Sequence, residues 1–271
     1  MVVEEQSLMW LAMLGYLMAG GVSVIGVVFN REWGRLTLAL LSGGLFLHGL
    51  SLGLRWHRLG HGPFVSMFEI LSSNLWSLTL AVTLFYWFYP TLRATTVVTL
   101  PTLLILMGWL IVSGSGDTAI PPTYDTIWLY IHIGFGKIAL GAILVAMGIA
   151  GIILLRTLGF MERFFERLPD SQRLDELLYR LAALGFIFHS LMLVAGAIWS
   201  LDAWGRYWSW DPLETWTLHT WLLLALFLHL RPLFRPPPVV GALFIWAVFI
   251  FAFLVFFGIP FVSQAPHQGA V

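Results

Sequence analysis

Long runs of apolar residues recur along the whole chain, separated by short segments that hold most of its charges. Each run is close to the roughly 20 residues that a helix needs to cross a bilayer. Backbone polar groups cannot stay unpaired in lipid, so such runs must be helical, and alternating ten-residue strands are not found. The pattern predicts about eight spans, approximately at 8–29, 36–54, 75–89, 95–112, 127–155, 181–201, 216–234 and 239–262.

The organisation that follows is an all-α, polytopic integral membrane bundle with a single domain over residues 1–271. The first residues include Glu4 and Glu5 but no Lys or Arg, unlike the basic start of a cleaved signal peptide, so the first run is predicted to be a retained span. The connection 156–180 mixes arginines with Phe and Leu and predicts an amphipathic helix on the inner membrane surface.

Composition supports this class. The chain is 59% hydrophobic and 10% charged, whereas a soluble domain carries roughly a quarter charged residues. The formal net charge of zero gives no reason to expect nucleic acid as a partner. The chain has no cysteine, which excludes disulfides, thiolate ligands and thiol nucleophiles, so any metal must rest on histidine or carboxylate.

The arginines predict the orientation, because Lys and Arg are retained on the cytoplasmic side. With the N-terminus outside, the inner connections hold Arg31, Arg35, Arg93, Arg156, Arg163, Arg167, Arg173, Arg180, Arg231 and Arg235. The outer connections then hold only Arg55, Arg58 and Arg206. This bias predicts that both termini are extracytoplasmic, and it places His57, His61, His132 and His267 outside.

The most unusual stretch is the outward segment 202–216 between the sixth and seventh spans. It contains Trp204, Gly205, Arg206, Tyr207, Trp208, Ser209, Trp210, Asp211, Pro212, Leu213, Glu214, Thr215 and Trp216. Aromatic belts also gather Trp and Tyr at span ends, but they need no carboxylate between the rings. A porphyrin would use such stacking faces, with Arg206 pairing a propionate. Asp211 precedes a proline and is interpreted as a turn residue rather than an acid or base.

This segment resembles the WWD motif of haem-handling membrane proteins, most of all the CcsA (ResC) type cytochrome c biogenesis protein of system II cytochrome c synthases. The segments 63–69, 128–132 and 228–231 also resemble that family. The motif departs from the family at Leu213, where a lysine is usual, and the tail around His267 matches loosely.

The resemblance implies a haem b (iron protoporphyrin IX) site. Two outward histidines would hold the iron, mapping to His132 and His267, with His57 and His61 as alternatives to His267. His229 maps to an intramembrane ligand whose second ligand comes from a partner subunit. Neutral imidazole independently suits haem iron in a chain without cysteine. The motif residues expected to contact haem are Trp204, Gly205, Arg206, Trp208, Trp210, Asp211 and Trp216.

The remaining polar residues within spans have several interpretations. Hydrogen bonds between helices are the favoured one for His48 and His189. His219 is a candidate for supporting the motif from beneath. Lys137 is a candidate partner for a haem propionate or for Glu69, and snorkelling to the surface is as good an interpretation.

The resemblance implies that haem is transported, presented and attached covalently to an apocytochrome c with a Cys-x-x-Cys-His motif. It also implies a ResB/CcsB-type partner subunit and the bacterial cytoplasmic membrane. The chain would be part of a haem lyase, and whether it is an enzyme by itself is left open. No catalytic residue is assigned, because proximity and orientation would supply the catalysis. The alternatives are a system I type haem exporter or chaperone, and a non-haem transporter or regulatory protein whose histidines line an ion path.

Overall fold

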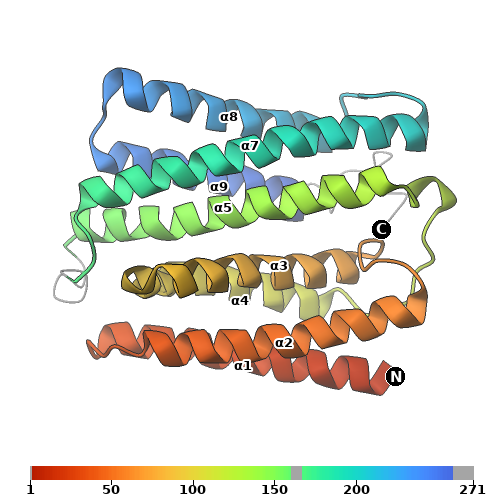
Figure 1. The fold of residues 1–271 in the computed structure, drawn as a ribbon, viewed down its shortest axis with the longest axis horizontal. Helices are drawn as coiled ribbons and strands as arrows, with labels where there is room; N and C mark the ends of the chain where they lie inside the picture. The colour runs from red at the N-terminus through yellow and green to blue at the C-terminus, as the bar shows by residue number, and fades with distance from the viewer. Residues whose placement is uncertain (1, 160–166, 259–271) are drawn as a thin grey trace. The chain divides into compact units, whose positions relative to one another are not determined.

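The computed structural model describes residues 2–159 and 167–258. Every regular element in these ranges is helical, and eight helices are long and apolar enough to cross a membrane (Figure 1). The α-helices are α1 (Val2–Val28), α2 (Gly34–Leu59), α3 (Met67–Phe88), α4 (Thr96–Val112), α5 (Ile127–Thr157), α7 (Ser171–Trp204), α8 (Pro212–Phe234) and α9 (Pro238–Phe257). Short 3-10 helices, η1 (Pro90–Thr95) and η2 (Pro122–Tyr124), precede α4 and α5. The predicted class and the predicted number of spans are confirmed, and the chain is an integral membrane protein.

Helix α3 starts well before the predicted span, because polar residues interrupt its apolar run. Helix α3 begins at Met67, eight residues before the predicted boundary, because Ser66 caps it. The Ser66 hydroxyl accepts the Glu69 N–H at 3.2 Å, and the Glu69 carboxylate accepts the Ser66 N–H at 3.3 Å. This reciprocal capping satisfies two N–H groups that a helix start leaves unpaired. Residues 72–74 are polar yet buried inside the bundle. Their polarity ended the apolar run, so the prediction left out the first turns of α3.

The second difference concerns the predicted surface helix over 156–180. Residues 171–180 are the first turns of α7 and continue without a break into the span. Leu174 and Leu178 are fully buried there, and Asp175 accepts two hydrogen bonds from Arg231 of α8, at 2.9 and 2.6 Å. Residues 160–166 lie outside the described residues. A separate surface helix is therefore wrong for 171–180.

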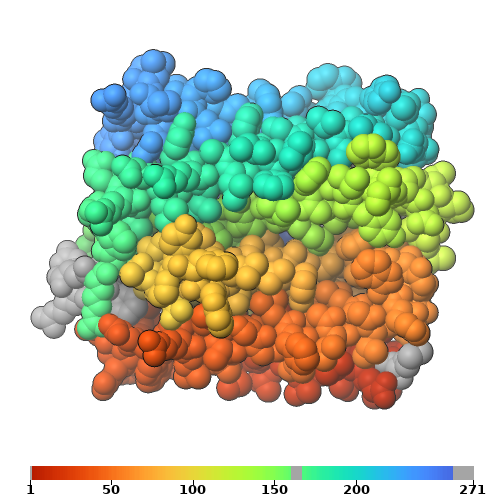
Figure 2. All heavy atoms as spheres, viewed as in Figure 1, coloured from red at the N-terminus to blue at the C-terminus, as the bar shows by residue number. Residues whose placement is uncertain are grey.

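The chain forms two compact units, 1–119 with 155–170 and 120–154 with 171–271. In the first unit α1 and α2 lie along each other, and Figure 2 shows their side chains closely packed on the face in view. Their close approach depends on Gly44, where a Cβ atom would come within 2.7 Å of the Tyr16 ring. In the second unit α5 is the most deeply buried helix. The single domain over 1–271 stays a prediction.

A buried ion-pair cluster closes one end of the first unit. Arg55 is 2% exposed, and its guanidinium lies 3.0 Å from carboxylate oxygens of both Glu5 and Glu69. Arg58 adds contacts to Glu5 at 3.0 Å and to Asp117 at 2.5 Å. The Arg58 guanidinium lowers the pKa of the exposed Asp117 carboxyl. Two arginines on the predicted outer side thus face three carboxylates, so the cluster has no excess of positive charge.

Candidate functional site

The tryptophan-rich segment is a short loop held between two helix ends of the second unit. Helix α7 ends at Trp204, and Gly205 follows with φ of +72°, a left-handed conformation that glycine adopts without strain. Helix α8 begins at Pro212, and the Asp211 carboxylate accepts the Glu214 N–H at 2.9 Å. Asp211 is therefore the N-cap of α8. Its predicted role as a turn residue is confirmed.

Hydrogen bonds from both helices fix the loop backbone. Ser200 of α7 donates to the carbonyl oxygen of Arg206 at 2.7 Å. Glu214 of α8 accepts the Ser209 N–H at 2.7 Å and lies 3.1 Å from the Ser209 hydroxyl. Asp211 and Glu214 are buried, so water does not compete for these bonds. The sequence analysis included Ser209 and Glu214 in the segment without giving them a role, and it missed Ser200. An N-cap Asp followed three residues later by Glu is a capping signal.

The aromatic side chains of the segment point into different surroundings. Tyr207 and Trp210 are 59% and 69% exposed, and Arg206 is exposed beside them. Trp208 is half-buried and packs edge-on against Trp210 with ring centroids 5.8 Å apart. Within the described residues the Trp208 indole N–H is buried without an acceptor. The loop therefore offers exposed aromatic faces and a cation.

Trp204 and Trp216 are anchored more firmly. Trp204 packs on Trp199 and Tyr124, with centroid distances of 4.9 and 6.2 Å. Trp216 lies 5.4 Å from the Phe251 ring of α9 and stays 37% exposed. Trp204 thus joins the loop to a buried aromatic cluster, while Trp216 covers the start of α8.

His132 on α5 is oriented by its neighbours on α7. Its Nδ1 lies 2.9 Å from the carbonyl oxygen of Met192. A carbonyl oxygen can only accept, so Nδ1 carries the proton and Nε2 is the nitrogen with the lone pair. The imidazole also lies parallel to Trp199, with an interplanar angle of 24°. Metal-binding histidines commonly donate their other ring N–H to a carbonyl oxygen in this way.

A glycine on α7 makes room for this histidine. A Cβ atom at Gly196 would lie 2.6 Å from the His132 Nδ1 atom, closer than atoms can approach. Gly196 and Trp199 are three residues apart and share a helix face. Because Trp199 also contacts Trp204, the structure connects His132 to the tryptophan-rich loop through one side chain. Sequence reasoning missed both Gly196 and Trp199, and only the pairing of α5 with α7 reveals them.

His229 lies in a different place from His132 and the loop. It is 17 residues after Pro212 on the same helix, roughly 25 Å along its axis at 1.5 Å per residue. Its Nδ1 donates to the Ala225 carbonyl at 2.7 Å, so Nε2 again carries the lone pair. The ring is exposed, although it sits inside a span. His219 has the same arrangement, with Nδ1 2.7 Å from the Thr215 carbonyl oxygen.

The other histidines have structural partners. His48 bridges the Tyr16 and Ser72 hydroxyls, and His189 lies 3.1 Å from the Thr217 carbonyl oxygen. Both are hydrogen bonds between helices, as predicted. Both ring nitrogens of His61 face carbonyl oxygens, at 2.9 and 2.8 Å. Coordination by His61 would break one of these bonds.

Two candidates from the sequence are affected differently by the structure. His57 is exposed, and His267 lies outside the described residues. Glu69, which the sequence analysis named as a candidate partner for Lys137, is bound by Arg55 and by the backbone N–H groups of Val65 and Ser66.

Comparison with known proteins gives one consistent family. The family model described as Cytochrome C assembly protein matches residues 64–267, well over half of the chain. The protein named Cytochrome c biogenesis protein CcsA from Microcystis aeruginosa is 31% identical in an alignment 232 residues long that covers 66% of this chain and 70% of the relative. Proteins of the same name from Carica papaya and Nymphaea alba are 25% and 24% identical, covering 80% and 93% of this chain and 81% and 90% of theirs.

Proposed function

The chain belongs to the cytochrome c assembly protein family, and we propose that it presents haem as the membrane subunit of a system II cytochrome c synthase. Family membership makes it a membrane protein of cytochrome c biogenesis that handles haem. One observation supports the specific proposal most strongly: the Met192 carbonyl holds His132 with Nε2 as its lone-pair nitrogen, stacked on the tryptophan that contacts the loop.

The residues present fit haem b. His132 offers a neutral, oriented imidazole, Trp208 and Trp210 offer aromatic faces, and Arg206 offers an exposed cation for a propionate. When bound, haem supplies the iron that imidazole ligates and the vinyl groups that accept thiols. His267 would supply the second imidazole ligand. His57 is the alternative that remains accessible, whereas His61 is less suited because both of its ring nitrogens face carbonyl oxygens.

His229 supports a second haem site shared with a partner. An exposed imidazole inside a span is costly when it faces lipid, so such residues mark functional contacts. Its Nδ1 is satisfied by its own helix, which leaves Nε2 directed outward. We propose that a ResB/CcsB-type subunit covers this face of α8 and supplies the second ligand. The subunit would thereby also shield the ring from lipid.

The protein's contribution to attachment is positioning. The loop from Gly205 to Asp211 is fixed at both ends, so the backbone that carries its aromatic residues and Arg206 is held in place. A held porphyrin can present one edge to the two cysteines of an apocytochrome c Cys-x-x-Cys-His motif. The absence of cysteine in this chain suits that role, because no internal thiol competes. We place this site on the extracytoplasmic face of a bacterial cytoplasmic membrane, following the arginine distribution.

The test is the visible spectrum of the purified protein with its partner subunit, oxidised and reduced. We expect a b-type spectrum that is lost in His132→Ala and recovered when imidazole is added, because free imidazole replaces the missing ligand. His229→Ala should also lower the haem content of the complex, because it removes the proposed ligand of the second site. A colourless wild-type complex supplied with haem would contradict the proposal and favour a transporter or regulatory role.

A further inference from the structure

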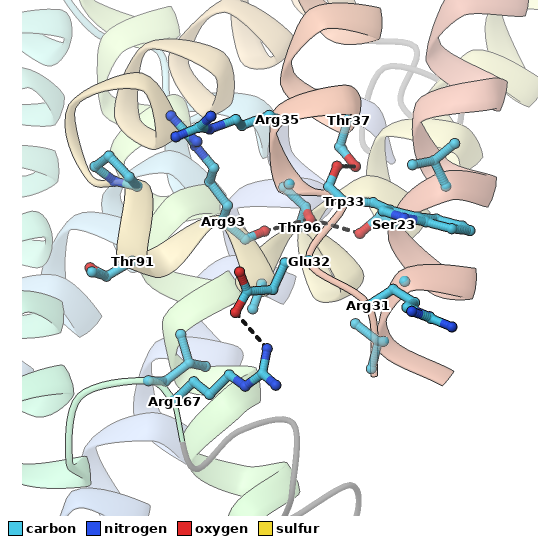
Figure 3. A pocket seen from close by; sticks show the side chains of 17 residues that line it. Ser23, Arg31, Glu32, Trp33, Arg35, Thr37, Thr91, Arg93, Thr96 and Arg167 are labelled. Atoms are coloured by element: carbon cyan, nitrogen blue, oxygen red, sulfur yellow. Dashed lines mark hydrogen bonds and ion pairs between the residues drawn. The ribbon is translucent and has the colours of Figure 1, made fainter. Parts of the chain in front are cut away.

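A cationic pocket lies in the first unit, and no histidine is among its described lining residues. It has a volume of about 660 Å³. The end of α1, the start of α2, the η1 segment and residues 167–168 line it (Figure 3). Its charged lining consists of Arg31, Glu32, Arg35, Arg93 and Arg167. The site therefore combines a concave surface with an excess of positive charge.

The single carboxylate does not neutralise this charge. Glu32 forms an ion pair with Arg167 at 2.5 Å. Among the described residues no acidic side chain pairs with Arg31, Arg35 or Arg93. Figure 3 shows the side chains of Arg35 and Arg93 converging on one part of the pocket, while Glu32 points toward Arg167. Two guanidinium groups that converge without a carboxylate between them repel each other unless an anion lies there.

The backbone adds to this preference for an anion. Helix α2 starts at this pocket, and its N-cap, Trp33, provides no side-chain acceptor for the first N–H groups. A helix start without a cap carries partial positive charge. Gly34 allows Arg93 to pack on this start, because a Cβ atom there would lie 3.0 Å from the Arg93 Cβ. The Arg93 Nε donates to the Tyr86 carbonyl at 3.0 Å, which fixes its stem beside the helix start.

We propose that this pocket binds the phosphate group of an anionic phospholipid. Phosphate oxygens match the fork of donors that a guanidinium presents. The pocket lies at the ends of membrane-spanning helices, where headgroups are found. Its lining residue Trp33 is 41% exposed, and Phe29 and Leu36, close to the lining residues in sequence, are 68% and 50% exposed. Acyl chains can cover these side chains while the headgroup enters the pocket. The arginine distribution predicts the cytoplasmic leaflet, which is rich in anionic lipid.

Haem is a weaker candidate for the same pocket, although its propionates are anionic. The described lining residues include no histidine, methionine or tyrosine that could ligate iron. The site therefore recognises charge without a metal bond. The proposal is independent of the haem role, because it uses none of the residues assigned to haem.

The test uses the full-length protein in dodecyl maltoside, with thermal unfolding followed by tryptophan fluorescence. The protein is titrated separately with phosphatidylglycerol, phosphatidylcholine and inorganic phosphate. We compare Arg35→Gln/Arg93→Gln with Arg180→Gln/Arg235→Gln, which removes two exposed arginines of the same predicted side outside the pocket. Arg35→Lys/Arg93→Lys keeps the charge, and the single Arg35→Gln is used if the double variant does not fold.

We expect phosphatidylglycerol, but not phosphatidylcholine, to raise the unfolding midpoint. The concentration for half of this effect should rise roughly 25-fold in the double Gln variant, since each basic residue at an anionic surface contributes about fivefold. The single Gln variant should show about fivefold by the same reasoning. The control variant should behave like the wild type. The Lys variant should lie between the wild type and the double Gln variant, because lysine keeps the charge but lacks the fork of donors.

Arginine-dependent stabilisation by inorganic phosphate alone would support phosphate recognition and identify a soluble source instead of a lipid. Equal responses of the pocket and control variants to phosphatidylglycerol would overturn the proposal, because the effect would then be general surface charge. Stabilisation by haem but not by phosphatidylglycerol would overturn it as well.

Discussion

Replacing Arg55 with methionine should destabilise the first unit strongly, because the change removes a buried cation and leaves its carboxylates behind. Removing one partner of a buried ion pair costs about 3–5 kcal/mol. The lower end applies here, since Glu5 keeps Arg58 at 3.0 Å and Glu69 keeps the N–H groups of Val65 and Ser66. The expected loss is therefore about 3 kcal/mol of unfolding free energy.

Thermal unfolding of the detergent-solubilised variant measures this loss. A change of about 3 kcal/mol corresponds to a midpoint lower by roughly 6–12 °C for a chain of this size. Arg58→Met is the matched control, and it should cost only about 1 kcal/mol, because its partner Asp117 is 56% exposed and Glu5 keeps Arg55. Adding Glu5→Gln and Glu69→Gln to Arg55→Met should restore much of the midpoint, since neutral amides need no counter-charge.

Two results would refute the reasoning. The first is an Arg55→Met midpoint that matches the Arg58→Met control. The second is an unfolding midpoint that does not recover when Glu5→Gln and Glu69→Gln are added to Arg55→Met. The loss of stability would then come from packing rather than from uncompensated charge.

Three further predictions concern the second unit and the loop that contains Asp117, between α4 and α5. Gly196→Ala should displace the imidazole beside it and reduce the haem absorbance per protein at least several-fold, whereas Gly108→Ala, where a Cβ meets nothing within 4 Å, should leave the spectrum unchanged. Glu214→Ala should cost about 1–3 kcal/mol and open the tryptophan-rich loop to limited proteolysis, and equal cleavage rates would contradict this. The lowered pKa of Asp117 means that its ion pair stabilises the protein fully above the ordinary pKa of about 4 and less as pH falls through the folded value. The midpoint difference between wild type and Asp117→Asn should thus be present at neutral pH and vanish in acid.

The sequence predicts the spans well because the length of an apolar run is a local property. It predicts their starts poorly where polar residues are buried by other helices. Ser72, Ser73 and Asn74 lower the hydropathy of α3, yet they face the bundle interior. Asp175 suggests a surface helix, but Arg231 of α8 neutralises it. Such partners are distant in sequence, so no local pattern reveals them.

In the candidate site, too, local features could be predicted from the sequence and contacts between distant residues could not. The turn at Asp211 could be predicted, since an Asp before a proline followed by Glu214 is a local helix-start signal. The orientation of His132 could not, because it depends on the Met192 carbonyl and on the space left by Gly196. The haem contacts of the tryptophans and the assignment of His267 stay predictions.

The bonds that hold residues 205–211 also affect how quickly a ligand can be captured. A disordered loop must lose conformational entropy when it closes on a ligand, which weakens binding and slows productive encounters. Here that ordering is completed during folding, by Ser200 from one helix and Glu214 from the next. A porphyrin arriving at this loop meets a preorganised surface, so substitutions of its exposed aromatic residues should change the dissociation rate far more than the association rate.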